Sequence, residues 1–177
     1  MTVQTSAGIA YDRAGPASDR PVVLVHAGVA DRRMWDPIWP ALTAERDALR
    51  LDLRGFGEST GRPAVLNPVG DLLSTLSELG IASCDLVGAS YGAAVAVETT
   101  LTRPGLARSL LLCAPGGSLI AEATADLQAF FDAERAALAG DDLAAAVEAN
   151  LRWWLDGPHR PAGSVPAPIR ELVARMQ

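Results

Sequence analysis

The sequence contains no lysine, so its 15 basic residues are all arginine, and they stand against 21 acidic residues. We attribute the missing lysine to the base composition of the gene and not to a chemical requirement. The resulting net charge of −6 provides no positive field for nucleic acid, and it disfavours an anionic membrane surface. The composition therefore predicts a protein with neither nucleic acid nor membrane as its partner.

Long apolar runs and targeting signals are also missing. No apolar run approaches the roughly 20 residues of a membrane span, and residues 1–10 lack the basic and apolar regions of a secretory signal. The two cysteines, Cys84 and Cys113, each lie in or beside an apolar run, so we expect reduced, buried thiols, with a disulfide as the alternative. These features predict a cytoplasmic protein.

What is present is an alternation of short apolar runs with helix-like segments. Such runs, bounded by turn residues, are typical of strands buried in a parallel sheet. Strands are predicted at residues 8–13, 21–26, 48–53, from residue 85, and at 109–113. Helices are predicted at residues 34–44, at 69–79, and from the end of the strand that starts at residue 85 to about residue 102. Asp36-Pro37 is expected to be the cap and first turn of the helix at 34–44. This order predicts right-handed crossovers and a mostly parallel α/β sheet.

The pattern changes after residue 118, where no further strand signal occurs. Residues 122–138, 141–155 and 168–176 instead have the spacing of amphipathic, largely alanine-rich helices. We therefore predict two parts: an α/β core over residues 1–117 and a helical segment over residues 118–177.

The chain is organised around residues 85–94, where an apolar run ends in Gly-Ala-Ser-Tyr-Gly and a run of small, helix-forming residues follows at once. A strand that turns so sharply into a helix forces Ser90 into a strained conformation and exposes its hydroxyl, as a nucleophile elbow requires. Gly88 and Gly92 lack the Cβ atoms that would collide at the turn. An ordinary turn serine is the alternative, but the strand before and the helix after favour a nucleophile.

Four motifs together resemble those of the α/β-hydrolase superfamily, in particular its single-domain, lidded esterase, lactonase and peptidase-like members. They are Leu-Val-His-Ala-Gly at 24–28, with Ala27 in place of the usual first glycine, Asp-Leu-Arg-Gly-Phe-Gly-Glu-Ser at 52–59, the elbow at 88–92, and Ala-Pro at 114–115. The resemblance implies a mostly parallel α/β-hydrolase sheet with a helical lid over 118–177, and with the C-terminal strands and helices absent. It implies hydrolysis of a small-molecule acyl substrate (an ester, lactone, thioester or activated amide) through an acyl-enzyme on Ser90, with no cofactor and no metal.

The resemblance also assigns roles around the nucleophile. The oxyanion hole is expected from the N–H groups of Tyr91 and Gly28, with Val29 as second choice. His26 is expected to order the loop that carries Gly28, and a catalytic base is its alternative role. Asp52 and Arg54 are expected to stabilise their turn.

Three tryptophans are candidates for an apolar acyl pocket. Trp153 and Trp154 lie in the predicted lid, and Trp35 follows the oxyanion loop with Val29. Ordinary packing between lid and core is the alternative for all three. Relatives that cleave carbon–halogen bonds or epoxides have aspartate at the elbow, so Ser90 argues against an alkyl-enzyme mechanism.

The acid and the base that should follow Ser90 are not evident. Residues 114–118 hold no carboxylate, and His159, in Gly-Pro-His-Arg-Pro, is expected to be a solvated loop histidine. We therefore expect Ser90 to react only weakly or not at all, and a non-catalytic hydrolase-like binding protein or an inactive fragment is the alternative. The strand at 109–113 is expected to leave an unpaired apolar edge, where a second copy or a complementing chain would pair.

Overall fold

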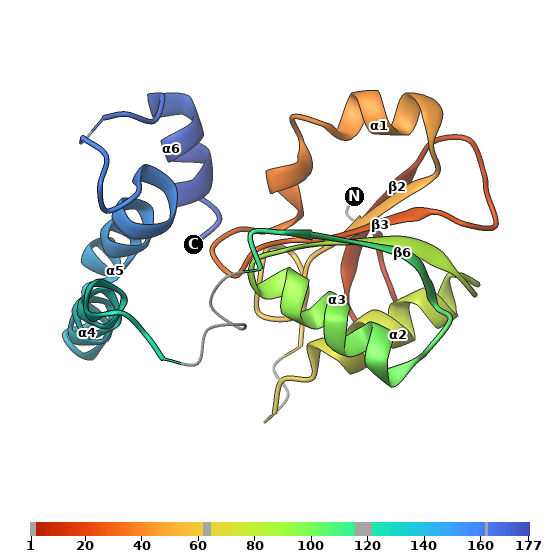
Figure 1. The fold of residues 1–177 in the computed structure, drawn as a ribbon, viewed down its shortest axis with the longest axis horizontal. Helices are drawn as coiled ribbons and strands as arrows, with labels where there is room; N and C mark the ends of the chain where they lie inside the picture. The colour runs from red at the N-terminus through yellow and green to blue at the C-terminus, as the bar shows by residue number, and fades with distance from the viewer. Residues whose placement is uncertain (1–2, 62–64, 116–121, 162) are drawn as a thin grey trace. The chain divides into compact units, whose positions relative to one another are not determined.

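A computed structural model describes residues 3–61, 65–115, 122–161 and 163–177. The chain divides into two compact units, Met1–Leu119 and Ile120–Gln177, which are described separately below. The first contains a six-stranded sheet and three α-helices, and the second is helical (Figure 1).

The first unit alternates strands and helices as its apolar pattern predicts. Its strands are β1 (Val3–Gln4), β2 (Ala10–Ala14), β3 (Val22–Val25), β4 (Ala48–Leu51), β5 (Cys84–Ala89) and β6 (Ala107–Cys113). Its helices are the 3₁₀ helix η1 (Arg32–Trp35), α1 (Trp39–Glu45), α2 (Pro68–Glu78) and α3 (Tyr91–Thr102). The strand order is β1-β2-β4-β3-β5-β6, in which β4, β3, β5 and β6 run parallel and β1 and β2 antiparallel. The predicted α/β fold with a mostly parallel sheet is confirmed.

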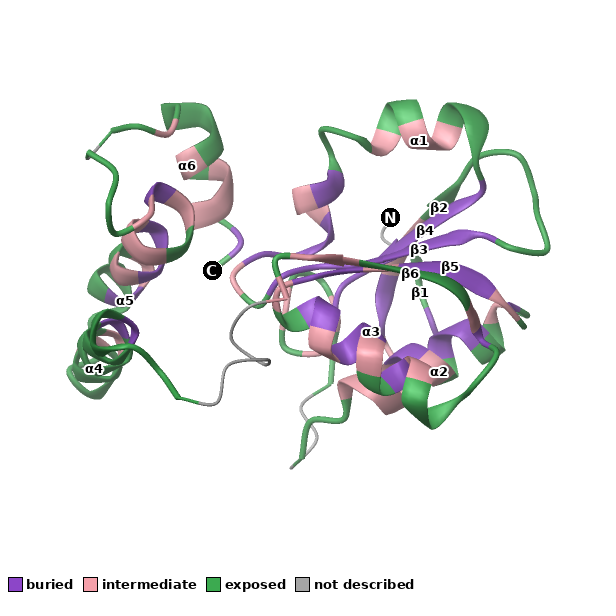
Figure 2. Cartoon of the chain, in the orientation of Figure 1, coloured by how far each residue is buried: buried purple, intermediate pink, exposed green. Residues whose placement is uncertain are grey.

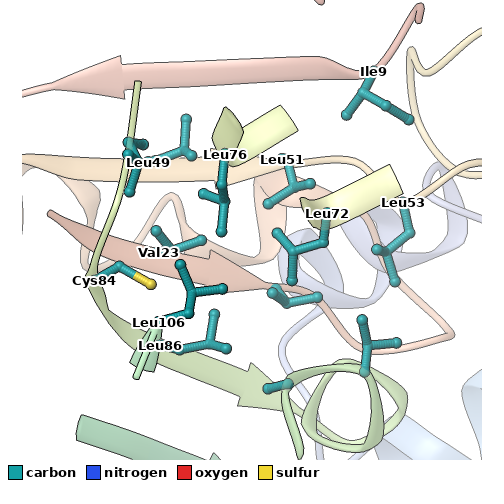
Figure 3. Close-up of a cluster of buried hydrophobic side chains, with 14 residues drawn as sticks. Ile9, Val23, Leu49, Leu51, Leu53, Leu72, Leu76, Cys84, Leu86 and Leu106 are labelled. Carbon is teal, nitrogen blue, oxygen red and sulfur yellow. The ribbon is translucent and has the colours of Figure 1, made fainter. Parts of the chain in front are cut away.

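The sheet has an apolar cluster on each face, because alternate residues of a strand point to opposite sides. On one face, Val23, Val25, Leu49 and Leu51 pack against side chains of α2 and α3, such as Leu72 (Figure 3). On the other face, a second cluster joins sheet residues to α1; its members include Val22, Leu24, Ala48, Trp39 and Leu42. The strands β3, β4 and β5 are largely buried between these layers, whereas every residue of β6 is partly or fully exposed (Figure 2).

The predicted helix at residues 34–44 is wrong in its start and in its cap. Asp31 caps the short helix η1 by accepting a hydrogen bond from the Arg33 N–H, and α1 begins only at Trp39, after an N-cap at Ile38. A continuous helix would need a backbone N–H at Pro37, which proline lacks, so the chain turns there. The pair Asp36-Pro37 therefore lies between two helices and does not cap one.

The strand β6 lies at the edge of the sheet and pairs with β5 alone among the described residues. Leu110 and Leu111 are 38% and 58% exposed. This is the apolar edge that the sequence predicts. Pairing of this edge with a second chain stays a prediction.

The second unit consists of α4 (Ala125–Ala139), α5 (Leu143–Asn150), the π-helix η3 (Leu151–Asp156) and α6 (Ala167–Ala174). The segment predicted as one helix over 141–155 is thus divided, because its hydrogen-bonding pattern changes at Leu151. Polar side chains join the helices: the Asn150 amide donates to Glu134 at 2.5 Å, and Arg170 pairs with Glu148 and Asp156. A role of this unit as a lid stays a prediction.

Candidate active site

The carboxyl ends of the parallel strands bring the predicted site residues of the first unit to one edge of the sheet. The register pairs Val25 with Leu51 and with Gly88, and it pairs Ala89 with Cys113. The residues that follow β3, β4 and β5 in the sequence, which include His26, Asp52 and Ser90, therefore leave the sheet side by side. Ligands of open α/β sheets bind at this edge.

Ser90 occupies a sharp turn between β5 and α3. Its φ of 49° and ψ of −113° lie outside the favoured regions for a residue with a side chain, a conformation that costs on the order of 1–3 kcal/mol. The Ser90 N–H donates to the Cys113 carbonyl at 2.9 Å, and the Ser90 carbonyl accepts from the Ala93 N–H at 2.9 Å. Neighbouring backbone thus holds the strained turn that the sequence predicts.

Gly88 and Gly92 permit two close backbone contacts around this turn. A Cβ atom on Gly88 would lie 2.3 Å from the Gly92 carbonyl oxygen, where β5 meets α3. A Cβ atom on Gly92 would lie 2.4 Å from the His26 carbonyl oxygen and 2.5 Å from that of Val25, where α3 passes the end of β3. Real side chains do not approach so closely, so both positions require glycine.

The Tyr91 N–H lies in the first turn of α3, where backbone donors have no partner within the helix. Within the described part of the chain it has no hydrogen-bond acceptor. Gly28 lies against the same residue, since a Cβ atom on Gly28 would be 3.2 Å from the Tyr91 Cβ. The structure thus brings together the two residues whose N–H groups the sequence analysis assigns to an oxyanion hole. Val29, the second choice, directly follows Gly28 in the same loop.

His26 is fully buried and uses both ring nitrogens in hydrogen bonds to backbone. Its Nε2 accepts from the Leu53 N–H at 2.9 Å, which leaves Nδ1 to donate to the Ala27 carbonyl at 2.7 Å. Burial lowers the pKa of His26 below 6.5, against smaller opposing effects of the Ala27 carbonyl, Asp52 and Asp31. A neutral imidazole with both nitrogens engaged joins the loop to the turn after β4 and has no free position for a proton from Ser90.

Asp52 and Arg54 organise the turn after β4. The buried Asp52 carboxylate accepts from the Glu58 N–H at 2.8 Å, and a Cβ atom on Gly57 would lie 2.2 Å from it. Arg54 forms two hydrogen bonds of 3.0 Å to the Asp71 carboxylate at the start of α2. Both residues therefore lie where a turn-stabilising role requires them.

A buried arginine that the sequence analysis did not single out lies next to this turn. Arg32, 8% exposed, bonds through its guanidinium to the carboxylates of Asp12, Asp52 and Glu58. Burial alone would lower the pKa of Arg32, but these carboxylates raise it above its usual value. No local sequence signal marks this arginine, because its three partners lie 20 residues before it and 20 and 26 residues after it.

The profile of the alpha/beta hydrolase family matches residues 22–176, which is most of the chain. The chain belongs to the alpha/beta hydrolase family. Its relatives include the strigolactone esterase D14 of Arabidopsis thaliana, 28% identical over 163 residues, which are 87% of this chain and 59% of that protein. A haloalkane dehalogenase of Bradyrhizobium diazoefficiens is 32% identical over 107 residues, 58% of this chain and 34% of that protein.

Solved structures of alpha/beta hydrolases share the fold. A hydrolase from Pseudomonas aeruginosa PA01 matches with a TM-score of 0.74 and 25% identity, over 99% of this chain and 65% of that one. The chain therefore spans less than two thirds of the length of each of these three proteins.

The remaining site candidates of the chain are three tryptophans. Trp35 is buried in the apolar cluster between the sheet and α1, in the first unit. Its Nε1 has no hydrogen-bond partner among the described residues. In the second unit, Trp153 stacks on Phe130 with ring centroids 5.7 Å apart, and Trp154 meets the same ring edge-on at 5.4 Å. All three rings thus pack within their own unit, and both a role in an acyl pocket and lid-to-core packing stay predictions.

The second unit has a hollow of its own. It measures about 270 Å³ and is lined by Phe130, Ala133, Ala149, Arg152, Trp153 and Pro158. The exposed His159 follows Pro158 in a turn that Arg152 holds through hydrogen bonds to the carbonyls of Gly157, Pro158 and Arg160. An exposed loop histidine is what the sequence predicts here.

Within the described ranges, no group of three or more His, Cys, Asp or Glu side chains could hold a metal ion. None of the described helices combines the length and the apolar character that crossing a bilayer requires. Cys84 and Cys113 are free thiols, Cys84 buried with its pKa raised by that burial to about 11, and Cys113 partly buried.

The buried state of His26 predicts a pH dependence of stability. Since its folded pKa lies below 6.5, the unfolded chain binds more protons as the pH falls through 6.5. Its contribution is complete above pH 6.5 and is lost as the pH falls toward the folded pKa, with a slope of at most about 1.4 kcal/mol per pH unit. Urea denaturation between pH 7.5 and 5 should show this slope in the parent and in the exposed-site control His159→Asn.

The variant His26→Asn should have a smaller slope over the same range. The carboxylates of Asp31, Asp47 and Asp85 do not interfere, because their folded pKa values lie below 3.8 and their contributions are lost only at lower pH. An unchanged slope in His26→Asn, or a slope lost in His159→Asn, would contradict the assignment.

Proposed function

We propose that this hydrolase cleaves a small ester, lactone, thioester or activated amide through an acyl-enzyme on Ser90. The observation that carries the proposal is the strained backbone of Ser90, which has φ 49° directly before α3. Gly28 lies close to Tyr91, the residue that follows this serine. A strained serine next to helix N-terminal donors is the arrangement that acyl transfer needs.

The reaction would begin with attack of the Ser90 Oγ on the substrate carbonyl carbon. As the new C–O bond forms, the carbonyl π electrons move to oxygen, and the N–H groups of Tyr91 and Gly28 would bind the resulting oxyanion. Collapse of this intermediate re-forms the carbonyl and expels the alcohol, thiol or amine. Water then attacks the acyl-Ser90 ester by the same path and releases the acid.

The proton of Ser90 needs an acceptor. His26 is unsuited, since its Nε2 already accepts from Leu53 and its Nδ1 donates to Ala27. Residues 3–115 contain no other histidine, so we propose that they supply the nucleophile and the oxyanion donors and that the base lies outside them. Without a base at Ser90, oxyanion binding alone sustains about 10³–10⁴-fold catalysis over water.

The nucleophile supports acyl transfer over displacement at a saturated carbon. A carboxylate that displaces a halide forms an ester, which water can cleave, whereas a serine would form an ether, which it cannot. The esterase among the relatives agrees with acyl transfer, and the dehalogenase does not decide the reaction of this chain.

Acylation of Ser90 by p-nitrophenyl acetate tests the proposal. The parent should release nitrophenol slowly, and its peptide containing residue 90 should carry an acetyl group in mass spectrometry. Ser90→Ala should carry none. The control Ser74→Ala, which removes a hydroxyl bonded to the Gly70 carbonyl in α2, should behave as the parent does.

Two outcomes would contradict the proposal. One is an acetyl group that never appears on Ser90 at any reagent concentration, while Ser74→Ala and the parent stay folded. The other is nitrophenol release that is equal in the parent and in Ser90→Ala and leaves acetyl on other residues.

A further inference from the structure

The loop that carries Gly28 is held at both ends by two adjacent residues that follow β4. At its start, the His26 Nε2 accepts from the Leu53 N–H at 2.9 Å. At its end, the Arg32 N–H donates to Asp52 Oδ1 at 2.8 Å. Only residues 27–31 lie between these anchors, and a hydrogen bond of 3.1 Å from the Ala30 N–H to the Ala27 carbonyl tightens them into a turn.

The anchor at Arg32 is built from charged groups with little access to solvent. The guanidinium donates to Asp52 Oδ2, to Asp12 Oδ2 at 3.1 Å and to Glu58 Oε2, while the Arg32 side chain is 10% and that of Asp52 0% exposed. One side chain therefore links the end of the loop to three carboxylates on β2 and on the turn after β4. A planar fork can make these contacts together, and a lysine ammonium cannot.

We propose that Arg32, through Asp52, is a positioning residue that fixes the Gly28 N–H for oxyanion binding. The proposal rests on the proposed function, because it gives the anchored loop a catalytic purpose. A short loop with both ends fixed has few conformations, so its amide is already oriented when charge develops on the substrate oxygen. Loss of one anchor would let Gly28 move away from Tyr91 while the elbow stays intact.

A purely structural role for Arg32 is the competing explanation, and Arg54 offers a matched control. The Arg54 side chain is also 10% exposed and forms a two-bond pair with a carboxylate, that of Asp71. Its bonds lead to α2 and to the carbonyls of Ala7 and Thr60, and none of them reaches residues 27–31. Arg54→Lys therefore perturbs a similar ion pair without touching the loop.

The first readout is the rate at which a fluorophosphonate probe labels Ser90, measured well below the melting temperature of each variant. Ser90 of Arg32→Lys should be labelled about 10- to 100-fold more slowly than Ser90 of the parent. Complete loss of one oxyanion donor costs about 10²–10³ in rate, and the effect is smaller here because the loop is loosened and not removed. Arg54→Lys should stay within about twofold. Glu58→Gln, which removes a half-exposed partner of Arg32, provides a milder variant with slowing in the same direction if Arg32→Lys does not fold.

The second readout is amide hydrogen exchange, which does not depend on a reactive serine. Exchange at residues 27–31 should accelerate in Arg32→Lys and Glu58→Gln and stay unchanged in Arg54→Lys, with residues 90–94 unchanged in all three. Equal slowing of labelling in Arg32→Lys and Arg54→Lys, or unchanged exchange at 27–31, would overturn the positioning role. If Ser90 is not labelled even in the parent, the proposed function fails, and the exchange result alone then decides whether Arg32 positions Gly28.

Discussion

Gly92→Ala is expected to lower the free energy of unfolding of the first unit by about 2–3 kcal/mol. In an ordinary helix this change would be favourable by about 1 kcal/mol. Here the new Cβ would lie 2.4 Å and 2.5 Å from the carbonyl oxygens of His26 and Val25, and neither is the end of a flexible side chain. Relief requires α3 to move away from β3, which loosens the packing between them.

Gly140→Ala is the matched control for this change. Gly140 has φ −86°, and a Cβ atom there would lie 3.5 Å from its nearest neighbours, the carbonyl oxygens of Ala136 and Ala137. Its effect should stay within about 0.5 kcal/mol. Urea denaturation monitored by hydrogen exchange measures Gly92→Ala through the β3 and β5 amides of the first unit and Gly140→Ala through the α4 and α5 amides of the second. A Gly92→Ala chain as stable as its parent would show that α3 and β3 do not approach so closely.

Asp52→Ala is expected to cost about 3–5 kcal/mol, the usual result of removing one partner from a buried ion pair. The Asp52 carboxylate accepts from the N–H groups of Arg32 and Glu58 and pairs with the Arg32 guanidinium. Its removal leaves two backbone donors without an acceptor and leaves a buried cation with fewer partners. Against a total stability of about 5–15 kcal/mol for a protein of this kind, such a loss is large.

Asp71→Ala removes the same chemical group from the pair with Arg54. The Asp71 side chain is 17% exposed, compared with 0% for Asp52, so water can replace part of what is lost. We expect a cost of about 1 kcal/mol. Thermal and urea unfolding of both variants at pH 7 give the comparison. Similar costs for the two would indicate that burial does not distinguish these ion pairs.

Helix α1 shows why some local features escaped the sequence analysis. The apolar spacing at residues 34–44 is helical, and two short helices preserve much of that spacing. Whether one helix or two form there depends on the missing N–H of Pro37 and on the Asp31 cap of η1. The change from α5 to the π-helix η3 is similar, because a shift in hydrogen-bonding pattern leaves the sequence periodicity almost unaltered.

The sequence by itself determined the elbow, because Ser90 between Gly88 and Gly92 is a local requirement of sterics: strand, strained residue and helix follow one another within ten residues. It also determined that most strands run parallel, which follows from their alternation with helices. Only the tertiary structure decided the surroundings of Arg32. Its three carboxylate partners lie 20 residues before it and 20 and 26 residues after it. No local pattern encodes such contacts, since they exist only once β2, β4 and the following turn lie side by side in the folded sheet.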